Sequence, residues 1–320
     1  MATSEQYIGR RETLGLGIES EAGTGVAAQS WLRWLEQDLK PKTTVVENES
    51  AIGVVDRVED SEVTGRQMEG KIGGKITVDT IGFILLGMWG TVASTTAVEG
   101  IVTHTFSLKQ SSIPTTLSIT SVTPLRTQRF AYATIESFEL EAETGKYVTF
   151  SSSVKARIGV PANDTTALTT QTEFTSKHIT LKLAANTAGI AGATKLKAMS
   201  LKLSAERKAN DFLPLGEEDN VEFDLGAFEP KGEFVVRCTS DEYEATFLAN
   251  TRQAIEIAMV NGDESLAFAA SKVRFRELEY SKDKDEVVTA TISFYCEFDT
   301  TTNSSLVPVL KNTVEEYVAA

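Results

Sequence analysis

Glu69-Gly-Lys-Ile-Gly-Gly-Lys-Ile-Thr-Val-Asp79 is an extended stretch that leads straight into a short apolar segment, residues 80–89. Lys231-Gly-Glu-Phe-Val-Val-Arg-Cys-Thr-Ser-Asp241 is built in the same way and leads into residues 242–250. Each stretch has the composition of a β-strand, and the spacing of apolar residues after it predicts a short helix. Because this strand–helix unit occurs twice, the sequence predicts a chain of two related β modules.

The two stretches align without a gap through the strand and the helix. Setting Gly70 on Gly232 also sets Leu86 on Leu248. Farther along each half, a strand-like segment carries the same Glu-Leu-Glu core, in Phe138-Glu-Leu-Glu141 and in Arg276-Glu-Leu-Glu279. Few residues are identical, so the similarity is one of pattern.

The predicted fold class is mainly β, with two related antiparallel β-sandwich or barrel modules, each flanked by a short α-helix, and an extended N-terminal arm. Residues 288–298 alternate apolar and polar side chains, which is typical of a half-buried antiparallel strand. The expected organisation is an arm at 1–40, a first module at 41–157, a Thr-rich linker at 158–176, and a second module with a C-terminal tail at 177–320.

Both expected helices have boundaries that the sequence indicates. Asp79 is the expected N-cap of the first helix and Gly90 its end. Its apolar residues at helical spacing predict one buried face, made of Ile81, Ile84, Leu85 and Met88. The second helix is expected to start after Asp241, with a face made of Tyr243, Phe247 and Leu248.

The arm is expected to be mobile because residues 9–15 and 23–25 are too rich in glycine for a packed element. Trp31, Leu32 and Trp34 stand out within it. Exposed tryptophans are unfavourable, so these three side chains are candidates for burial against another subunit.

The net charge of −14 argues against a nucleic-acid-binding protein, because phosphate groups need positive partners. Solubility alone explains such a charge, and a surface that DNA passes without adhering is the more specific interpretation. Candidate acidic residues for that surface are Glu139, Glu141, Glu277 and Glu279. A glycosidase carboxylate pair is a weaker interpretation than the solvated polar face of a strand.

No catalytic or metal centre is indicated, and we expect neither enzyme activity nor a cofactor. His104 and His178 have no Cys or acidic neighbour at ligand spacing, and His104 is expected to be a half-buried strand residue. Residues 65–71 match the start of a phosphate-binding loop, but Ile72 stands where Ser or Thr must bind magnesium. The cysteines are expected to be reduced and buried, and no apolar run is long enough to cross a membrane.

The order of these segments resembles the tail tube proteins of long-tailed bacteriophages. The resemblance rests on Gly9-Arg-Arg11, Trp31-Leu32, Ile52-Gly-Val-Val-Asp56, Glu69-Gly-Lys-Ile-Gly-Gly-Lys75, Thr103-His-Thr-Phe106, Met199-Ser-Leu-Lys-Leu-Ser204 and Gly232-Glu-Phe-Val-Val236. It implies β modules in sixfold rings that stack into a hollow conduit for DNA, with an arm or loop bridging the rings. It implies no catalytic residues.

Two modules per chain combined with sixfold rings imply a homotrimeric, pseudo-sixfold ring, with a homohexamer as the alternative. The expected partners are other copies of the chain, other tail proteins and genomic DNA passing through the lumen. The expected location is the virion tail, assembled in the host bacterial cytoplasm. At least one Glu pair is expected to line the lumen, and the arm tryptophans to join rings. The alternatives are a related injection-system tube or tail-terminator component, or a carbohydrate-binding β-sandwich protein.

Overall fold

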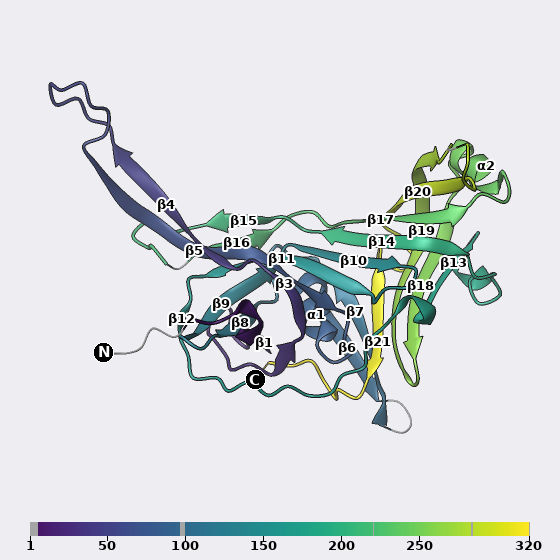
Figure 1. Cartoon of the computed structure of the whole chain (residues 1–320), viewed down its shortest axis with the longest axis horizontal. Helices are drawn as coiled ribbons and strands as arrows, with labels where there is room; N and C mark the ends of the chain where they lie inside the picture. Colours follow the sequence, from purple (N-terminus) through teal and green to yellow (C-terminus); the bar gives the residue numbers. More distant parts are fainter. Residues whose placement is uncertain (1–5, 97–99, 220, 283, 320) are drawn as a thin grey trace.

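The computed structural model describes residues 6–96, 100–219, 221–282 and 284–319. The described residues are mainly β, their strand pairings are antiparallel, and they include the two α-helices that the sequence predicts (Figure 1). Short 3-10 helices cover Gly9–Arg11, Ser176–His178 and Thr187–Gly189. The strands form connected sheets around a common core, so the two halves of the chain share one interior.

One sheet, here called the long sheet, runs through both halves of the chain. At one edge, β3 (Trp34–Gln37) and β4 (Lys40–Asn48) follow each other end to end along β5 (Asp60–Lys75). After β5 the strands are, in spatial order, β11 (Thr149–Arg157), β10 (Ser137–Glu143), β14 (Ala198–Glu206), β17 (Glu229–Arg237), β20 (Thr289–Cys296) and the second part of β19 (Glu264–Tyr280). The link between the halves is the β10–β14 pair.

Two further groups of strands enclose the core. The N-terminal sheet consists of β2 (Ser30–Leu32), β1 (Thr13–Ile18), β8 (Leu117–Val122), β9 (Thr127–Ile135) and β12 (Val160–Pro161). The cross sheet consists of β6 (Gly90–Thr96), β7 (Val102–Leu108), β21 (Val307–Asn312), the first part of β19, β18 (Gln253–Asn261) and β13 (Ile179–Ala184). A small hairpin, β15 (Ala209–Phe212) and β16 (Glu222–Leu225), stands apart.

The first strand pair of each half has the same irregularity in the same place. In β3–β5 one extra residue, Leu35, bulges out beside Gly74. In β14–β17 the extra residue is Met199, beside Val236. Gly74 and Val236 occupy the same position in the gapless alignment of the two stretches. A bulge is a specific local feature, so its coincidence supports the relation between the halves.

The remaining strands of the long sheet also follow the same order in each half, β5–β11–β10 and β17–β20–β19. Glu139 faces Ser151 in the first half, and Glu279 faces Thr291 in the second. These registers relate Glu139 to Glu279, whereas the Glu-Leu-Glu alignment set Glu139 on Glu277. The two-residue shift leaves all these side chains on the same face, because side chains alternate with a period of two.

The first helix, α1 (Ile81–Trp89), is buried on all sides, so the prediction of one apolar face was wrong. Elements of both the N-terminal and the cross sheet surround it, and Tyr317 packs edge-on against Phe83. The N-cap is Thr80 rather than Asp79. Gly90 ends the helix in a left-handed conformation, φ 89°, as predicted.

The second helix, α2 (Glu242–Leu248), begins after Asp241 as predicted, but none of its residues is buried. Tyr243 and Phe247 pack against the edge of the core. Leu248 is 73% exposed, so its assignment to the apolar face was wrong. The helix lies beside β19.

The expectation of a loose arm at 1–40 was wrong for its central part. Leu14, Leu16 and Ile18 are buried in β1, which lies between β2 and β8. Close packing explains the two glycines of β1, because a side chain at Gly15 would collide with Ala28 and one at Gly17 with the backbone of Ala27. Glycine here allows a second chain segment to approach a core strand.

The linker and the tail also pack more closely than their composition indicates. Phe174 is fully buried within the expected Thr-rich linker, and the amide of Val78 donates to the carbonyl of Thr172 over 3.2 Å. Strand β21, from the expected tail of the second module, pairs with β7 of the first half as well as with β19. Residues after 306 therefore complete the core of the first half.

His104 lies at this junction and is fully buried, rather than half-buried as expected. Its Nε2 donates to the carbonyl of Val314 over 2.9 Å and lies 3.1 Å from Oδ1 of Asn312, while Nδ1 lies 2.8 Å from the hydroxyl of Ser94. Asn312 in turn donates to the carbonyl of Val78 and to the hydroxyl of Tyr317. This buried polar network fastens residues 312–317 to the first half.

Candidate functional site

The candidate functional surface is the polar face of the long sheet. Its strands alternate, so that Phe138 and Leu140 of β10 point into the core while Glu139 and Glu141 lie on the other side. The second part of β19 has the same alternation, although its inward side chains are only partly buried. All four predicted acidic residues therefore lie on one face of one sheet: Glu139, Glu141, Glu277 and Glu279.

The first acidic pair, Glu139 and Glu141, has a positively charged neighbour. Nζ of Lys202, on the neighbouring strand β14, lies 2.8 Å from Glu139 and 3.5 Å from Glu141. The hydrogen bond to Glu139 raises the pKa of Lys202, although partial burial opposes this. Lys231 makes a similar contact with Glu206 over 2.8 Å. Positive side chains thus alternate with the carboxylates, and sequence reasoning from the acidic residues alone missed them.

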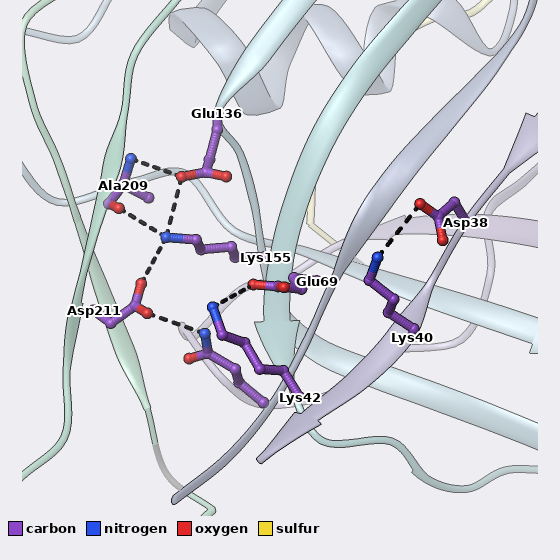
Figure 2. Close-up of polar contacts among 9 residues, drawn as sticks. Asp38, Lys40, Lys42, Glu69, Glu136, Lys155, Ala209 and Asp211 are labelled. Atoms are coloured by element: carbon purple, nitrogen blue, oxygen red, sulfur yellow. Dashed lines mark hydrogen bonds and ion pairs between the residues drawn. The ribbon is translucent and has the colours of Figure 1, made fainter. Parts of the chain in front are cut away.

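The same face carries a denser charge cluster at the end formed by the first half (Figure 2). Nζ of Lys155 lies 3.2 Å from Glu136 and 2.7 Å from Asp211, and it also donates to the carbonyl of Ala209. Burial opposes the charge on Lys155, but Asp211 and Glu136 together raise its pKa. Because Asp211 belongs to β15, this cluster holds the β15–β16 hairpin on the first half.

Further contacts fix that hairpin against the base of the β4–β5 hairpin. The guanidinium of Arg66 lies 2.7 Å from Glu218, and the Arg66 amide donates to the Glu218 carbonyl. Gln67 donates to Asp211 over 3.0 Å. The connection from β14 to β17, which contains this hairpin, is therefore anchored to the first half.

The long sheet ends in two unpaired edges within the described part of the chain. Along one edge, β3 and β4 pair with β5 only. Along the other, residues 274–280 of β19 pair with β20 only. The two edges lie at opposite ends of the molecule (Figure 1). An unpaired edge presents backbone donors and acceptors that a further strand can satisfy.

The predicted arm contacts lie elsewhere than expected. Trp31 and Leu32 are buried within their own chain, in β2. Trp34 is half-buried, and its indole N–H donates to the carbonyl of Glu12 over 2.9 Å. Because their own subunit already covers Trp31 and Leu32, these two side chains are not available for contacts between rings, and the expectation was wrong for them; Trp34 keeps part of its surface exposed.

The β4–β5 hairpin is an exposed apolar feature that sequence reasoning did not identify as a site. It projects from the body of the molecule (Figure 1), and residues 49–59 form its tip. Four aliphatic side chains near the tip are exposed: Ile52, Val54, Val55 and Val58. The available signal was an apolar cluster between two polar strands. Clustered apolar side chains on a projecting element are typical of a protein contact site.

No group of His, Cys, Asp and Glu residues suitable for a metal ion occurs in the part of the chain that the structure describes. Residues 65–71 lie inside strand β5 and form no phosphate-binding loop. Both cysteines are free, and burial raises the pKa of Cys296 to about 12, so its thiol is unreactive. None of the described helices has the length and apolar character needed to span a membrane.

Comparison with known proteins identifies a family for this chain. A search of curated proteins found no match. The family model described as phage tail tube protein matches residues 9–296, which include both α-helices and the whole long sheet. Members of this family are structural proteins of the virion tail that assemble with themselves and with other tail proteins. The chain therefore belongs to the phage tail tube protein family.

Proposed function

We propose that this protein is the major subunit of a phage tail tube, and that three chains form each ring of the tube. The observation that carries the proposal is the long sheet, in which two strand sets with the same order and the same bulge lie side by side within one chain. Three chains would supply six such sets. Rings would stack into a conduit through which the genome is ejected, after assembly in the host cytoplasm.

In this arrangement the polar face of the long sheet lines the lumen. Its core face points away from the lumen, toward the N-terminal sheet and the cross sheet. A closed barrel needs one face inward and one outward, and only the polar face is suited to a water-filled channel. All four Glu side chains would face the lumen, where Lys202 would partly neutralise Glu139 and Glu141. The net charge of −14 favours passage over binding.

Stacking would depend on the tip of the β4–β5 hairpin. Its exposed aliphatic side chains need a partner surface, and a neighbouring ring is the partner that a tube provides. This role replaces the one expected for Trp31 and Leu32.

Negative-stain electron microscopy of the purified protein tests the tube, and native mass spectrometry of single rings tests the stoichiometry. We expect hollow tubes and a mass of three chains per ring. Six chains per ring would favour the homohexamer and leave the tube intact. Protein that stays monomeric under all conditions, including high concentration and the presence of other tail proteins, would refute the proposed function.

A double substitution tests the hairpin, Val54→Asp with Val55→Asp. We expect rings that no longer stack. The matched control is Leu215→Asp, since Leu215 is an equally exposed aliphatic residue in a different loop. If the hairpin variant forms normal tubes, the tip of the β4–β5 hairpin does not contribute to stacking.

A further inference from the structure

The structure points to a specific strand pairing that closes the ring, which rests on the proposed function and goes beyond it. We infer that residues 277–282, at and just beyond the end of β19, pair antiparallel with residues 37–42 of the next chain, which run from the end of β3 into β4. The contact would reproduce between chains the β10–β14 pair that already joins the two halves within a chain.

The β10–β14 pair within the chain supplies the template for this contact. In the internal junction, Glu139 faces Ser204 and Ser137 faces Glu206. The strand registers relate Glu139 to Glu279, as described above. For the partner strand, Lys40 of β4 faces Glu69 of β5, and Ser204 of β14 faces Lys231 of β17. Glu69 and Lys231 occupy the same position in the gapless alignment. Lys40 therefore stands where Ser204 stands.

Carrying the register across gives a specific set of neighbours. Glu279 would face Lys40, and Glu277 would face Lys42. Opposite charges directly across a strand pair stabilise that pairing, and a shift by one residue would turn each charged side chain to the other face. The register between chains was derived from backbone pairings alone, without reference to charge. The match of Glu279 with Lys40 and of Glu277 with Lys42 therefore supports the proposed pairing independently.

The core side of the same pairing is also complementary. Tyr280 would face Leu39 and Leu278 would face Pro41. Tyr280, Leu39 and Leu278 are partly buried hydrophobic residues already in contact with the core. Each would lose its remaining solvent exposure when the other edge covers it.

The edges are also protected before assembly. In the single chain, Lys42 contacts Glu69 over 2.8 Å, and Lys40 lies 3.7 Å from Asp38. Pro41 has no amide hydrogen, so the predicted pairing has one donor fewer than the internal junction, where Ala205 takes that place. Proline and lysine on an edge strand discourage indiscriminate strand addition, so the correct partner must be recognised through its side chains.

Disulfide trapping tests the register. In a Cys238→Ser background, Lys40→Cys combined with Glu279→Cys places the two thiols directly opposite. The Arg207 amide donates to the Glu136 carbonyl, which makes the template positions a non-hydrogen-bonded pair, the closer kind. The matched control is Lys42→Cys with Glu279→Cys, a diagonal pair about 7–8 Å apart and too far for a disulfide.

We expect oxidised tubes of the first variant to run as linked chains on a denaturing gel, and tubes of the control to run as single chains. If wild-type tubes form but the first variant is not linked, or if the control is linked equally, the pairing is refuted and the tube function stands. If the wild-type protein forms neither rings nor tubes, the proposed function itself fails.

A charge exchange gives a second readout without cysteine. Lys40→Glu with Lys42→Glu should abolish rings, and so should Glu277→Lys with Glu279→Lys. All four substitutions together should restore rings, because opposite charges again face each other. All four substituted positions are exposed, so melting temperatures of the unassembled subunits should change little. A fourfold variant that assembles no better than either double variant refutes the pairing.

Discussion

The helices α1 and α2 follow the two aligned strands β5 and β17, yet every residue of α1 is buried and none of α2 is. The difference lies in what covers them. In the first half, β1, the β6–β7 hairpin and the segment around Tyr317 pack over the helix, whereas α2 lies beside β19 at the edge of the core. The same strand–helix unit can therefore be a core element or a surface element, depending on chain segments distant in sequence.

The comparison is tested most strongly by matched leucines in the two helices. Leu86 and Leu248 align, but Leu86 is buried and Leu248 is exposed. Leu86→Ala should lower the free energy of unfolding by about 2–5 kcal/mol, because it leaves a cavity in the core. Leu248→Ala should change it by less than about 0.5 kcal/mol. Urea unfolding of the unassembled subunit measures both, and similar midpoint shifts for the two variants would contradict the contrast.

The covering segment is tested by removing one hydroxyl. Tyr317 donates to the Asp79 carbonyl and accepts from Asn312, both in the interior. Tyr317→Phe should destabilise the subunit by about 1–3 kcal/mol, because buried polar groups lose a partner. Tyr280→Phe is the control, since its hydroxyl contacts Glu244 of α2 at the surface. Thermal unfolding measures both variants. Equal melting temperatures for the two variants would show that the hydrogen bonds of Tyr317 do not stabilise the subunit.

The smallest expected effect concerns acidity. Burial lowers the pKa of His104 from its ordinary value of 6.5. The unfolded chain then binds a proton at a higher pH than the folded chain, so stability is complete above 6.5 and falls as the pH drops below it. The urea midpoint should therefore decrease between pH 7.5 and 5.5 in wild-type protein and in a His178→Gln control, and decrease less in His104→Gln.

Asp79, whose pKa is raised chiefly by burial and also by Glu264, acts in the opposite direction, because its folded form binds a proton more readily. Comparison with His104→Gln isolates the histidine from this carboxyl. An identical pH response in that variant would mean that His104 is not the group responsible.

Much of the fold could be predicted from local pattern. The gapless match of Gly70 to Gly232 survives as a shared strand register with a shared bulge, and Asp241 and Gly90 were read correctly as helix boundaries. The four acidic residues lie on one sheet face because alternation along a strand fixes the face on which each side chain lies.

The rest depended on contacts between distant segments. Leu14 becomes a core residue only because β8, more than a hundred residues later, pairs with β1. Trp31 was misassigned for the same reason. Lys202 became visible as a partner of Glu139 only after the β10–β14 pairing was known. The glycine content of the arm indicated flexibility, whereas Gly15 and Gly17 allow close packing within the core.

The passage of β21 between β7 and β19 has a consequence for biosynthesis. Asn312 contacts Val78 across more than two hundred residues of sequence, and Tyr317 lies against α1. During translation the first half cannot seal its interior until residue 317 has left the ribosome, and contacts of such long range form slowly. We expect nascent chains to remain incompletely folded until then, so that subunits mature off the ribosome and meet one another only as finished molecules.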